Sequence, residues 1–225
     1  MADSTQIDTA RHPATVRVTH WLTTISFLAL LITGVEIVIS HPRFYWGEDG
    51  NVLMPPLFSL PIPASRASVP TGYGFVLPDQ NGWSRSLHFE AAWAAVFTAL
   101  LYVVWGLASG HFRRNLLPAG GGLSREAGAW SYNAVQRLVY LVVIFILAPL
   151  MLLTGLAMSP AIASVFPWAV AAFGGQQSAR TLHFFGTALL FFFLIVHIVM
   201  VYRAGFGARA GAMITGRAEG RKENA

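Results

Sequence analysis

The sequence has 225 residues, of which 55% are hydrophobic and 11% are charged, and it contains no cysteine. A soluble domain does not carry several charge-free runs of about twenty residues, so this composition predicts a polytopic membrane protein. The lack of cysteine sulfur excludes disulfides, thiolate-ligated iron–sulfur clusters and covalently attached c-type haem. The formal charge of +5 does not indicate nucleic acid as a partner, because the basic residues cluster beside the apolar runs.

Residues 1–16 form a polar segment before the first apolar run. They include Asp3 and Asp8 and lack the short basic start of a secretory signal. The run that follows is too long for a signal peptide and is not followed by a small-residue cleavage site. We therefore expect a cytoplasmic N-terminal segment and an uncleaved first span.

Four apolar runs are each long enough to cross about 30 Å of hydrocarbon. They cover residues 17–40, 86–110, 131–158 and 179–203. The sequence therefore predicts an all-α, integral membrane four-helix bundle within residues 17–203, followed by a basic, frayed cytoplasmic tail at 204–225. Pro149 lies inside the third run, where neighbouring helices tolerate a kink.

The basic residues are unequally divided between the two sides of this bundle. Both termini and the middle connection hold eleven of the 15 Lys and Arg residues, and the other two connections hold only Arg43, Arg66, Arg85 and Arg180. Positive charge accumulates on the cytoplasmic side of membrane proteins. The chain is therefore expected to cross the bacterial inner membrane with both termini in the cytoplasm.

The two connections on the opposite, outer side differ in length. The first, residues 41–85, contains seven of the 12 prolines and the aromatic residues Phe44, Tyr45 and Trp46. These residues predict a long periplasmic loop between helices 1 and 2, pressed onto the membrane interface. The second contains residues 161–173, which are apolar but too short to span and are interrupted by Pro167, so an interfacial helix or a re-entrant turn is expected.

Four histidines lie within the apolar runs, where an ionisable side chain is costly and usually marks a functional site. His183 and His197 share the fourth run, and their spacing of fourteen residues puts both on nearly one helix face, about 21 Å apart. With the N-terminus inside, His20 lies at the depth of His197 near the inner surface, and His88 lies at the depth of His183 near the outer surface.

Two opposed imidazoles fill both axial positions of a haem iron, which permits electron transfer and leaves no position for O₂. The sequence therefore predicts two b-type haems with the axial ligand pairs His20/His197 and His88/His183. For any single one of these histidines, a buried imidazole hydrogen-bonded across helices is the alternative.

Three of these histidines follow an arginine by three residues. Arg17, Arg85 and Arg180 each lie one helical turn nearer the membrane surface and on the same face as the histidine. A guanidinium group suits a carboxylate, so Arg85 and Arg180 are expected to bind the propionates of the outer haem and Arg17 those of the inner one. The alternative is that these arginines snorkel at span ends, as arginines commonly do.

A polar face begins the third run on the inner side. It consists of Asn133, Gln136, Arg137 and Tyr140, at spacings of three and four residues. This face is expected to bind either the propionates of the inner haem or a quinone headgroup. An ordinary polar helix end is the alternative.

Three further ionisable residues have open roles. Glu36 and Glu90 are acids near the outer surface, where a proton relay, a hydrogen bond to a ligand and a simple interfacial position are all consistent with the sequence. His111 lies at the inner depth of the second run and is the rival to the four predicted ligands.

These motifs resemble the bacterial di-haem membrane cytochromes b, which include the b-type subunits of nickel–iron hydrogenases and a small superoxide-oxidising member. The resemblance covers about residues 17–203. The matching segments are Thr19-His20-Trp21, Leu87-His88-Phe89 with Ala92-Trp93, Tyr132-Asn133 with Gln136-Arg137 and Tyr140, and His183 with His197. The resemblance implies the same two histidine pairs and electron exchange with the membrane quinone pool.

Residues 41–48 resemble members encoded with periplasmic molybdopterin-dependent oxidoreductases. We therefore expect electron transfer between the quinone pool and a periplasmic redox partner of that class. The protein is then an electron-transfer subunit rather than a stand-alone enzyme. Its oligomeric state is open. Superoxide oxidation with quinone as acceptor is the alternative, since the four outer arginines would steer the anion, although the long loop departs from the compact superoxide-oxidising members. A haem-free transporter or assembly factor is the third hypothesis.

Overall fold

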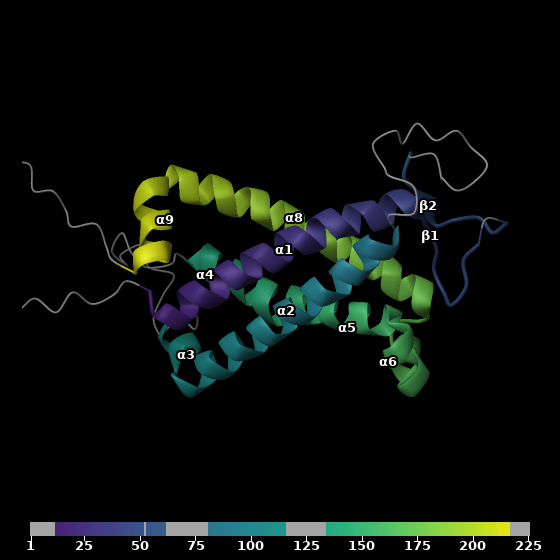
Figure 1. Ribbon diagram of the computed structural model, residues 1–225, viewed down its shortest axis with the longest axis horizontal. Helices are drawn as coiled ribbons and strands as arrows, with labels where there is room; N and C mark the ends of the chain where they lie inside the picture. The colour runs from purple at the N-terminus through teal and green to yellow at the C-terminus, as the bar shows by residue number, and fades with distance from the viewer. Residues whose placement is uncertain (1–11, 52, 62–80, 116–133, 217–225) are drawn as a thin grey trace, which may run out of the picture.

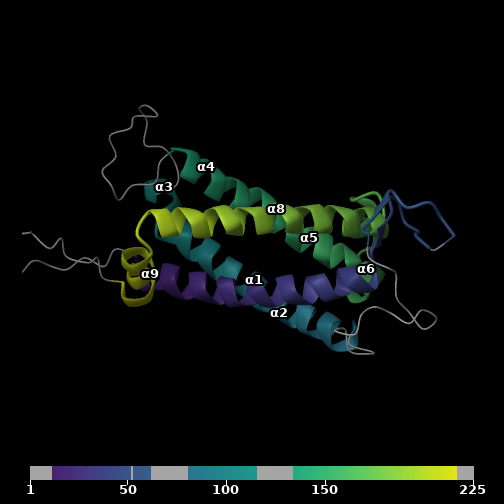
Figure 2. The ribbon, with the colours of Figure 1, turned by 90° about the horizontal axis from the view of Figure 1, so that it is seen from above.

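The computed structural model describes residues 12–51, 53–61, 81–115 and 134–216. Within them, four helical segments are long and apolar enough to cross a membrane, as the sequence predicts. The continuous ones are α1 (Ala14–Ser40), α2 (Asn81–Ala108) and α8 (Gln176–Arg203). The third span is composite and runs through α4 (Ala134–Val142), the π-helical segment η1 (Val143–Leu147) and α5 (Ala148–Met158). The spans lie side by side along the long axis of the molecule (Figures 1 and 2).

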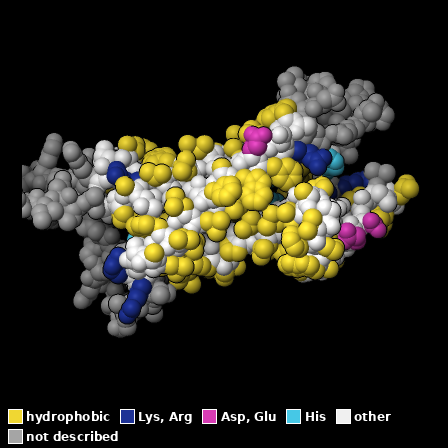
Figure 3. All heavy atoms as spheres, turned by 60° about the horizontal axis from the view of Figure 1, so that its bottom comes forward, with side chains coloured by type: hydrophobic (Ala, Val, Ile, Leu, Met, Phe, Trp, Pro, Cys, Tyr) yellow, Lys and Arg dark blue, Asp and Glu magenta, His cyan; other side chains and the backbone are white. Residues whose placement is uncertain are grey.

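The outside of the bundle is apolar along most of its length. Large hydrophobic side chains such as Ile25, Val104 and Phe192 are more than 60% exposed. Figure 3 shows hydrophobic side chains over the middle of the molecule, whereas Lys and Arg side chains lie toward its two ends. This is the surface that a lipid bilayer solvates.

Helices α1 and α2 pack along small side chains. Thr19, Ser26 and Thr33 are buried on α1 at intervals of seven residues, and Ser84, Ala91 and Thr98 repeat that interval on α2. Small side chains let membrane helices approach closely, and threonine hydroxyls bond the carbonyl one turn earlier, so little polarity is left exposed. Thr19, for example, donates to the Thr15 carbonyl at 2.8 Å.

Helices α5 and α8 form a second pair, which is also close-packed. Thr154 and Ala157 are fully buried on α5, and a Cβ added to Gly186 of α8 would lie 2.6 Å from the sulfur of Met151. Pro149 stands just after η1, where it has no N–H to give to the preceding turn. The wider π-helical turns absorb this missing bond, so the span continues through the proline.

The molecule has two distinct ends. At one, called the loop end, a short antiparallel hairpin joins β1 (Arg43–Phe44) to β2 (Phe58–Ser59), with Phe44 opposite Phe58. Two short helices, α6 (Pro160–Val165) and α7 (Pro167–Ala171), follow α5 near this end, and Pro167 begins α7. At the other, called the tail end, lie the start of α1, α3 (His111–Asn115) and α9 (Phe206–Thr215) (Figure 1).

The prediction of a frayed tail is wrong for residues 206–215. These residues form α9, which is separated from α8 by Gly205 and ends at Gly216, both with positive φ. The helix folds back to α1, where Arg17 and Trp21 donate to its last carbonyls. Hydrogen bonds to these otherwise unpaired carbonyls hold the end of α9 in place.

A candidate cofactor site between two helix pairs

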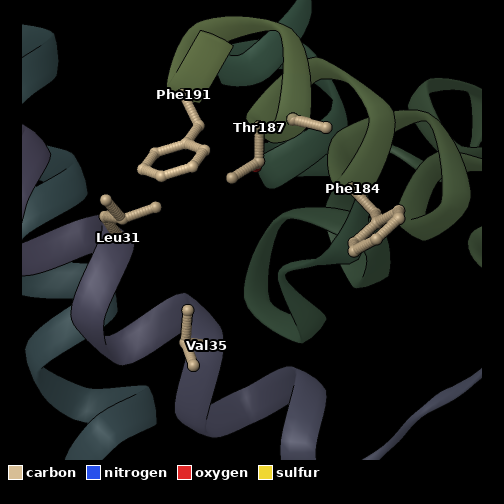
Figure 4. Close-up of a pocket in the computed structure, with 6 residues that line it drawn as sticks. Leu31, Val35, Phe184, Thr187 and Phe191 are labelled. Atoms are coloured by element: carbon tan, nitrogen blue, oxygen red, sulfur yellow. The ribbon is translucent and has the colours of Figure 1, made fainter. Parts of the chain in front are cut away.

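The two helix pairs pack closely within themselves, whereas contact between the pairs is sparse among the described residues. An apolar groove of about 230 Å³ lies where α1 faces α8. Figure 4 shows Leu31 and Val35 of α1 on one side of this groove and Phe184, Thr187 and Phe191 of α8 on the other. Apolar space of this kind between helices of a bundle is typical of a cofactor site.

The four histidines predicted as ligands lie close together in two pairs, one at each end of the bundle. The ring centroids of His88 and His183 are 6.4 Å apart at the loop end, and those of His20 and His197 are 6.3 Å apart at the tail end. An imidazole nitrogen binds a metal ion at about 2.0–2.1 Å and lies about 1.1 Å from its ring centre, so two rings on opposite sides of one ion have centres roughly 6.3 Å apart. Both pairs therefore have the spacing of two axial ligands of one iron.

Buried threonines hold the loop-end histidines. The Thr33 hydroxyl of α1 lies 2.9 Å from Nδ1 of His88, and the Thr154 hydroxyl of α5 lies 2.9 Å from Nδ1 of His183. With Nδ1 occupied in each ring, Nε2 is the nitrogen left for a ligand in the space between the pairs. Neither threonine was singled out by the sequence analysis.

A glycine follows each of these threonines. A Cβ added to Gly34 would lie 3.6 Å from Cε1 of His88, and one added to Gly155 would lie 3.6 Å from Cε1 of His183. Cε1 lies between the two ring nitrogens, so a side chain larger than methyl at either position would press against the imidazole ring. The two glycines therefore leave room beside both rings.

The described part of the first connection, residues 41–51 and 53–61, lies over the loop-end site; we call this segment the roof. Phe44 is 1% exposed and packs on Phe184, the residue after His183, at a centroid distance of 4.4 Å. The Gly47 carbonyl accepts from the backbone N–H groups of Gln177 and Ser178 at 3.0 and 3.2 Å. The loop thus occupies the first turn of α8 and satisfies backbone donors that have no partner within the helix.

This docking depends on a very close backbone approach. Gly175 caps α8 with φ of +116°, and a Cβ there would lie 2.3 Å from the carbonyl carbon of Gly47. The Thr181 hydroxyl then donates to the Tyr45 carbonyl at 2.7 Å. The part of the long loop that the structure describes is therefore bound tightly to α8.

Arg180 belongs to the same contact. Its guanidinium donates to the carbonyls of Arg43, at 3.0 Å, and of His41, and it lies over the ring of Phe44 at 4.9 Å. The structure thus gives Arg180 a loop-anchoring role that the sequence analysis did not foresee, and its contact with a propionate stays a prediction.

The tail-end pair has a different surrounding. Nδ1 of His20 is buried and has no hydrogen-bond partner among the described residues. Arg17 donates through Nη1 to the Ile214 carbonyl at 2.9 Å, while its buried Nε has no partner in the same part of the chain. Tyr140 approaches His197 through Phe193, with ring centroids 6.3 and 5.7 Å apart in turn.

The remaining candidates are less closely tied to either pair. Arg85 and Glu90 are exposed, and the Glu90 carboxylate accepts from Ser86 on its own helix at 3.2 Å. Glu36 is half-buried on α1. His111, the predicted rival ligand, packs in α3 against Trp105 with ring centroids 5.0 Å apart; burial lowers its pKa, and the nearby Arg114 guanidinium lowers it further.

Part of the predicted polar face lies outside the described residues. This applies to Asn133 and to the side chains of Gln136 and Arg137. Their predicted contacts with haem propionates or a quinone headgroup stay predictions.

A bundle of four apolar spans with two pairs of histidines between its halves is typical of a membrane cytochrome b. Comparison with known sequences gives the same class: the sequence model of prokaryotic cytochrome b561 matches residues 11–216. The chain belongs to the prokaryotic cytochrome b561 family.

Two curated relatives span most of the chain. A putative protein-methionine-sulfoxide reductase subunit, YedZ1, of Azospira oryzae is 29% identical over 206 residues, which cover 85% of this chain and 90% of the relative. A probable Ni/Fe-hydrogenase B-type cytochrome subunit of Cupriavidus necator is 24% identical over 233 residues, covering 91% and 83%. The chain is therefore a multi-pass inner-membrane protein of electron transport that binds b-type haem, and the hypothesis of a haem-free transporter or assembly factor is not supported.

Proposed function

We propose that this cytochrome binds two haems b and transfers electrons between membrane quinone and a redox partner on the periplasmic side. The observation that carries the proposal is the pair of ring separations, 6.4 Å at the loop end and 6.3 Å at the tail end, each suited to one iron held by two imidazoles. A bound haem b supplies one-electron chemistry at each position. His88 and His183 would hold the loop-end haem, and His20 and His197 the tail-end haem.

The distribution of basic residues supports the orientation, with the tail end in the cytoplasm and the loop end in the periplasm. His183 and His197 lie fourteen residues apart on α8, which corresponds to about 21 Å along the helix. Two sites at this spacing would divide the thickness of the membrane, so that no single transfer has to cross it.

The tail-end face near Tyr140 is our proposed quinone site. Tyr140 lies next to Phe193, which contacts His197, so a headgroup bound at Tyr140 would lie close to a ligand of the tail-end haem. Asn133, Gln136 and Arg137 would add polar donors to this face. Arg17 would bind the propionates of the same haem through its buried Nε, which has no partner among the described residues.

The docked loop supports the proposal of a protein partner. The roof above the loop-end pair is built from loop residues whose outer positions stay exposed, including Trp46 at 59% and Leu53 at 91%. The Azospira oryzae relative is described as a reductase subunit and the Cupriavidus necator relative as a hydrogenase subunit, so both are parts of oxidoreductases. We propose that the partner here is a periplasmic oxidoreductase of the molybdopterin-dependent class.

The decisive experiment is the haem stoichiometry of the purified protein. We expect two haems b per chain from extraction and a dithionite-minus-oxidised spectrum, and reduction of both by a quinol. A ratio of one haem per chain would contradict the proposal. Superoxide-dependent quinone reduction far above the spontaneous rate would instead identify a stand-alone superoxide oxidase.

A further inference from the structure

Two threonine–glycine pairs lie within the described membrane spans, one in each half of the bundle, and the threonine of each contacts a loop-end histidine. Thr33 and Gly34 on α1 lie against the imidazole of His88 on α2, and Thr154 and Gly155 on α5 lie against that of His183 on α8. Both threonines are 0% exposed, and both Oγ1–Nδ1 distances are 2.9 Å. The same arrangement thus arises from two separate parts of the sequence.

The direction of each hydrogen bond follows from the single proton of a hydroxyl group. Thr33 donates this proton to the Ala29 carbonyl at 2.7 Å, and Thr154 donates its own to the Leu150 carbonyl at 2.7 Å. Oγ1 is therefore the acceptor toward the histidine, and Nδ1 is the donor. A neutral imidazole that carries its proton on Nδ1 has its lone pair on Nε2.

We propose that Thr33 and Thr154 are positioning residues that fix the tautomer and the ring orientation of His88 and His183. The inference rests on the proposed haem ligation and extends it to the residues that prepare the ligands. A backbone carbonyl of the same helix accepts the proton of each threonine hydroxyl and so fixes its orientation. The hydroxyl oxygen then accepts from Nδ1–H of the histidine. Each Nε2 is thereby oriented toward the space between the helix pairs before a ligand binds. Groups that orient a metal-binding histidine in this way also raise its basicity.

The tail-end pair provides an internal contrast. Within residues 12–51, 53–61, 81–115 and 134–216, the buried Nδ1 of His20 has no hydrogen-bond partner, so no hydroxyl of these residues fixes its orientation. Removing the two threonine hydroxyls should therefore alter the loop-end haem and leave the tail-end haem unchanged.

The test uses Thr33→Val and Thr154→Val in the full-length, haem-loaded protein, because valine keeps the shape of threonine and lacks the oxygen. Thr98→Val is the matched control, since Thr98 is buried on α2 and donates to the Ala94 carbonyl at 2.7 Å. Thr33→Ser and Thr154→Ser restore the hydroxyl. The signals of the loop-end haem are identified as those absent from His183→Ala.

We expect each valine variant to raise the midpoint potential of the loop-end haem, because a less basic imidazole stabilises ferric iron less. The g values of its low-spin ferric EPR signal should shift as well, since they depend on the relative orientation of the two imidazole planes. The control and the serine variants should retain the wild-type values at both haems.

Unchanged potential and EPR spectra in both valine variants would overturn the inference while leaving two-haem ligation intact. If a valine variant loses the loop-end haem altogether, the serine variant decides: wild-type values support the inference, and equal loss overturns it. A wild-type protein with fewer than two haems would refute the proposed function itself, and that result is visible before any threonine is changed.

Discussion

Each end of the bundle has a pair of histidines, and the two pairs have different surroundings. At the loop end, both imidazoles are hydrogen-bonded to buried threonines, and a docked hairpin covers the site through Phe44. At the tail end, Nδ1 of His20 has no partner within the part of the chain that the structure describes. The short helix α9 lies near this end and is held by hydrogen bonds from Arg17 and Trp21. The loop-end site is therefore formed in advance by the fold, whereas the tail-end site depends more on its ligand.

This difference fits the proposal that the loop end faces a protein partner and the tail end exchanges electrons with quinone. A site that faces a protein partner benefits from fixed ligands, because little then changes when an electron arrives. A site that serves an exchangeable small molecule needs an accessible surface. Four substitutions test whether the two ends differ in this way.

The largest effect is expected from the axial ligands. His183→Ala should remove the loop-end haem completely and leave at least part of the tail-end signal, because each iron depends on its own pair of imidazoles. His197→Ala should do the reverse. Extracted haem per chain and the reduced-minus-oxidised spectrum measure both losses. His111→Ala is the control and should retain two haems; loss of a haem there would make His111 a ligand.

Filling the glycine beside a loop-end histidine should have the next largest effect. Gly155→Val places methyl groups near Cε1 of His183, where overpacking costs about 1–3 kcal/mol. We expect reduced occupancy of the loop-end haem alone, measured as haem per chain. Gly82→Val lies where an added Cβ meets nothing within 4 Å and serves as the control. Equal haem loss in both variants would contradict the steric explanation.

Arg180→Gln should loosen the attachment of the roof to α8. The change removes charge-assisted bonds to two loop carbonyls, each of which contributes about 1.5–3 kcal/mol. Proteolysis within residues 41–61 should accelerate, and the potential of the loop-end haem should shift while the haem remains bound. A changed potential with an intact loop would favour the propionate role instead. An accelerated loop cleavage with an unchanged potential would leave only the anchoring role.

The smallest effect is expected at α9. Trp21→Phe removes the hydrogen bond from Nε1 to the Met213 carbonyl, which is worth about 1 kcal/mol or less at this partly exposed position. Amide exchange of residues 206–215 should become faster without loss of either haem. Trp93→Phe, an exposed change on α2, is the control. If α9 amides exchange equally fast in both variants, the bond does not hold this helix.

Much of the fold could be predicted because the length of each apolar run, and the position of each histidine along it, can be read from the sequence. Each span crosses the bilayer once, so position along it gives depth. This was enough to anticipate that His20 lies near His197 and His88 near His183, whereas their binding of iron stays a prediction. The threonines were missed because an isolated Thr in an apolar run is usually a packing residue. Thr-Gly occurs four times in the sequence, and only its place inside two apolar runs, at 33–34 and 154–155, distinguishes these pairs.

The contacts of the arginines were harder to foresee. Arg180 binds carbonyls of residues more than a hundred positions away, so its partners depend on how the loop folds back. The order in α9 was missed for a similar reason: its residues are small and weakly patterned, and the helix end is fixed by Arg17 and Trp21 from the other end of the chain.

The sparse contact between the helix pairs has a consequence for the life of the protein in the cell. Each helical hairpin can insert into the bilayer as a unit. The two halves are then joined at the ends of the bundle, by the loop on α8 and by α9 on α1, while their described spans have little direct contact along their length. Bound porphyrin would fill the space between these spans. In a cell starved of iron, chains without haem would keep this space unfilled and be exposed to membrane proteases, so the amount of this cytochrome would follow the haem supply.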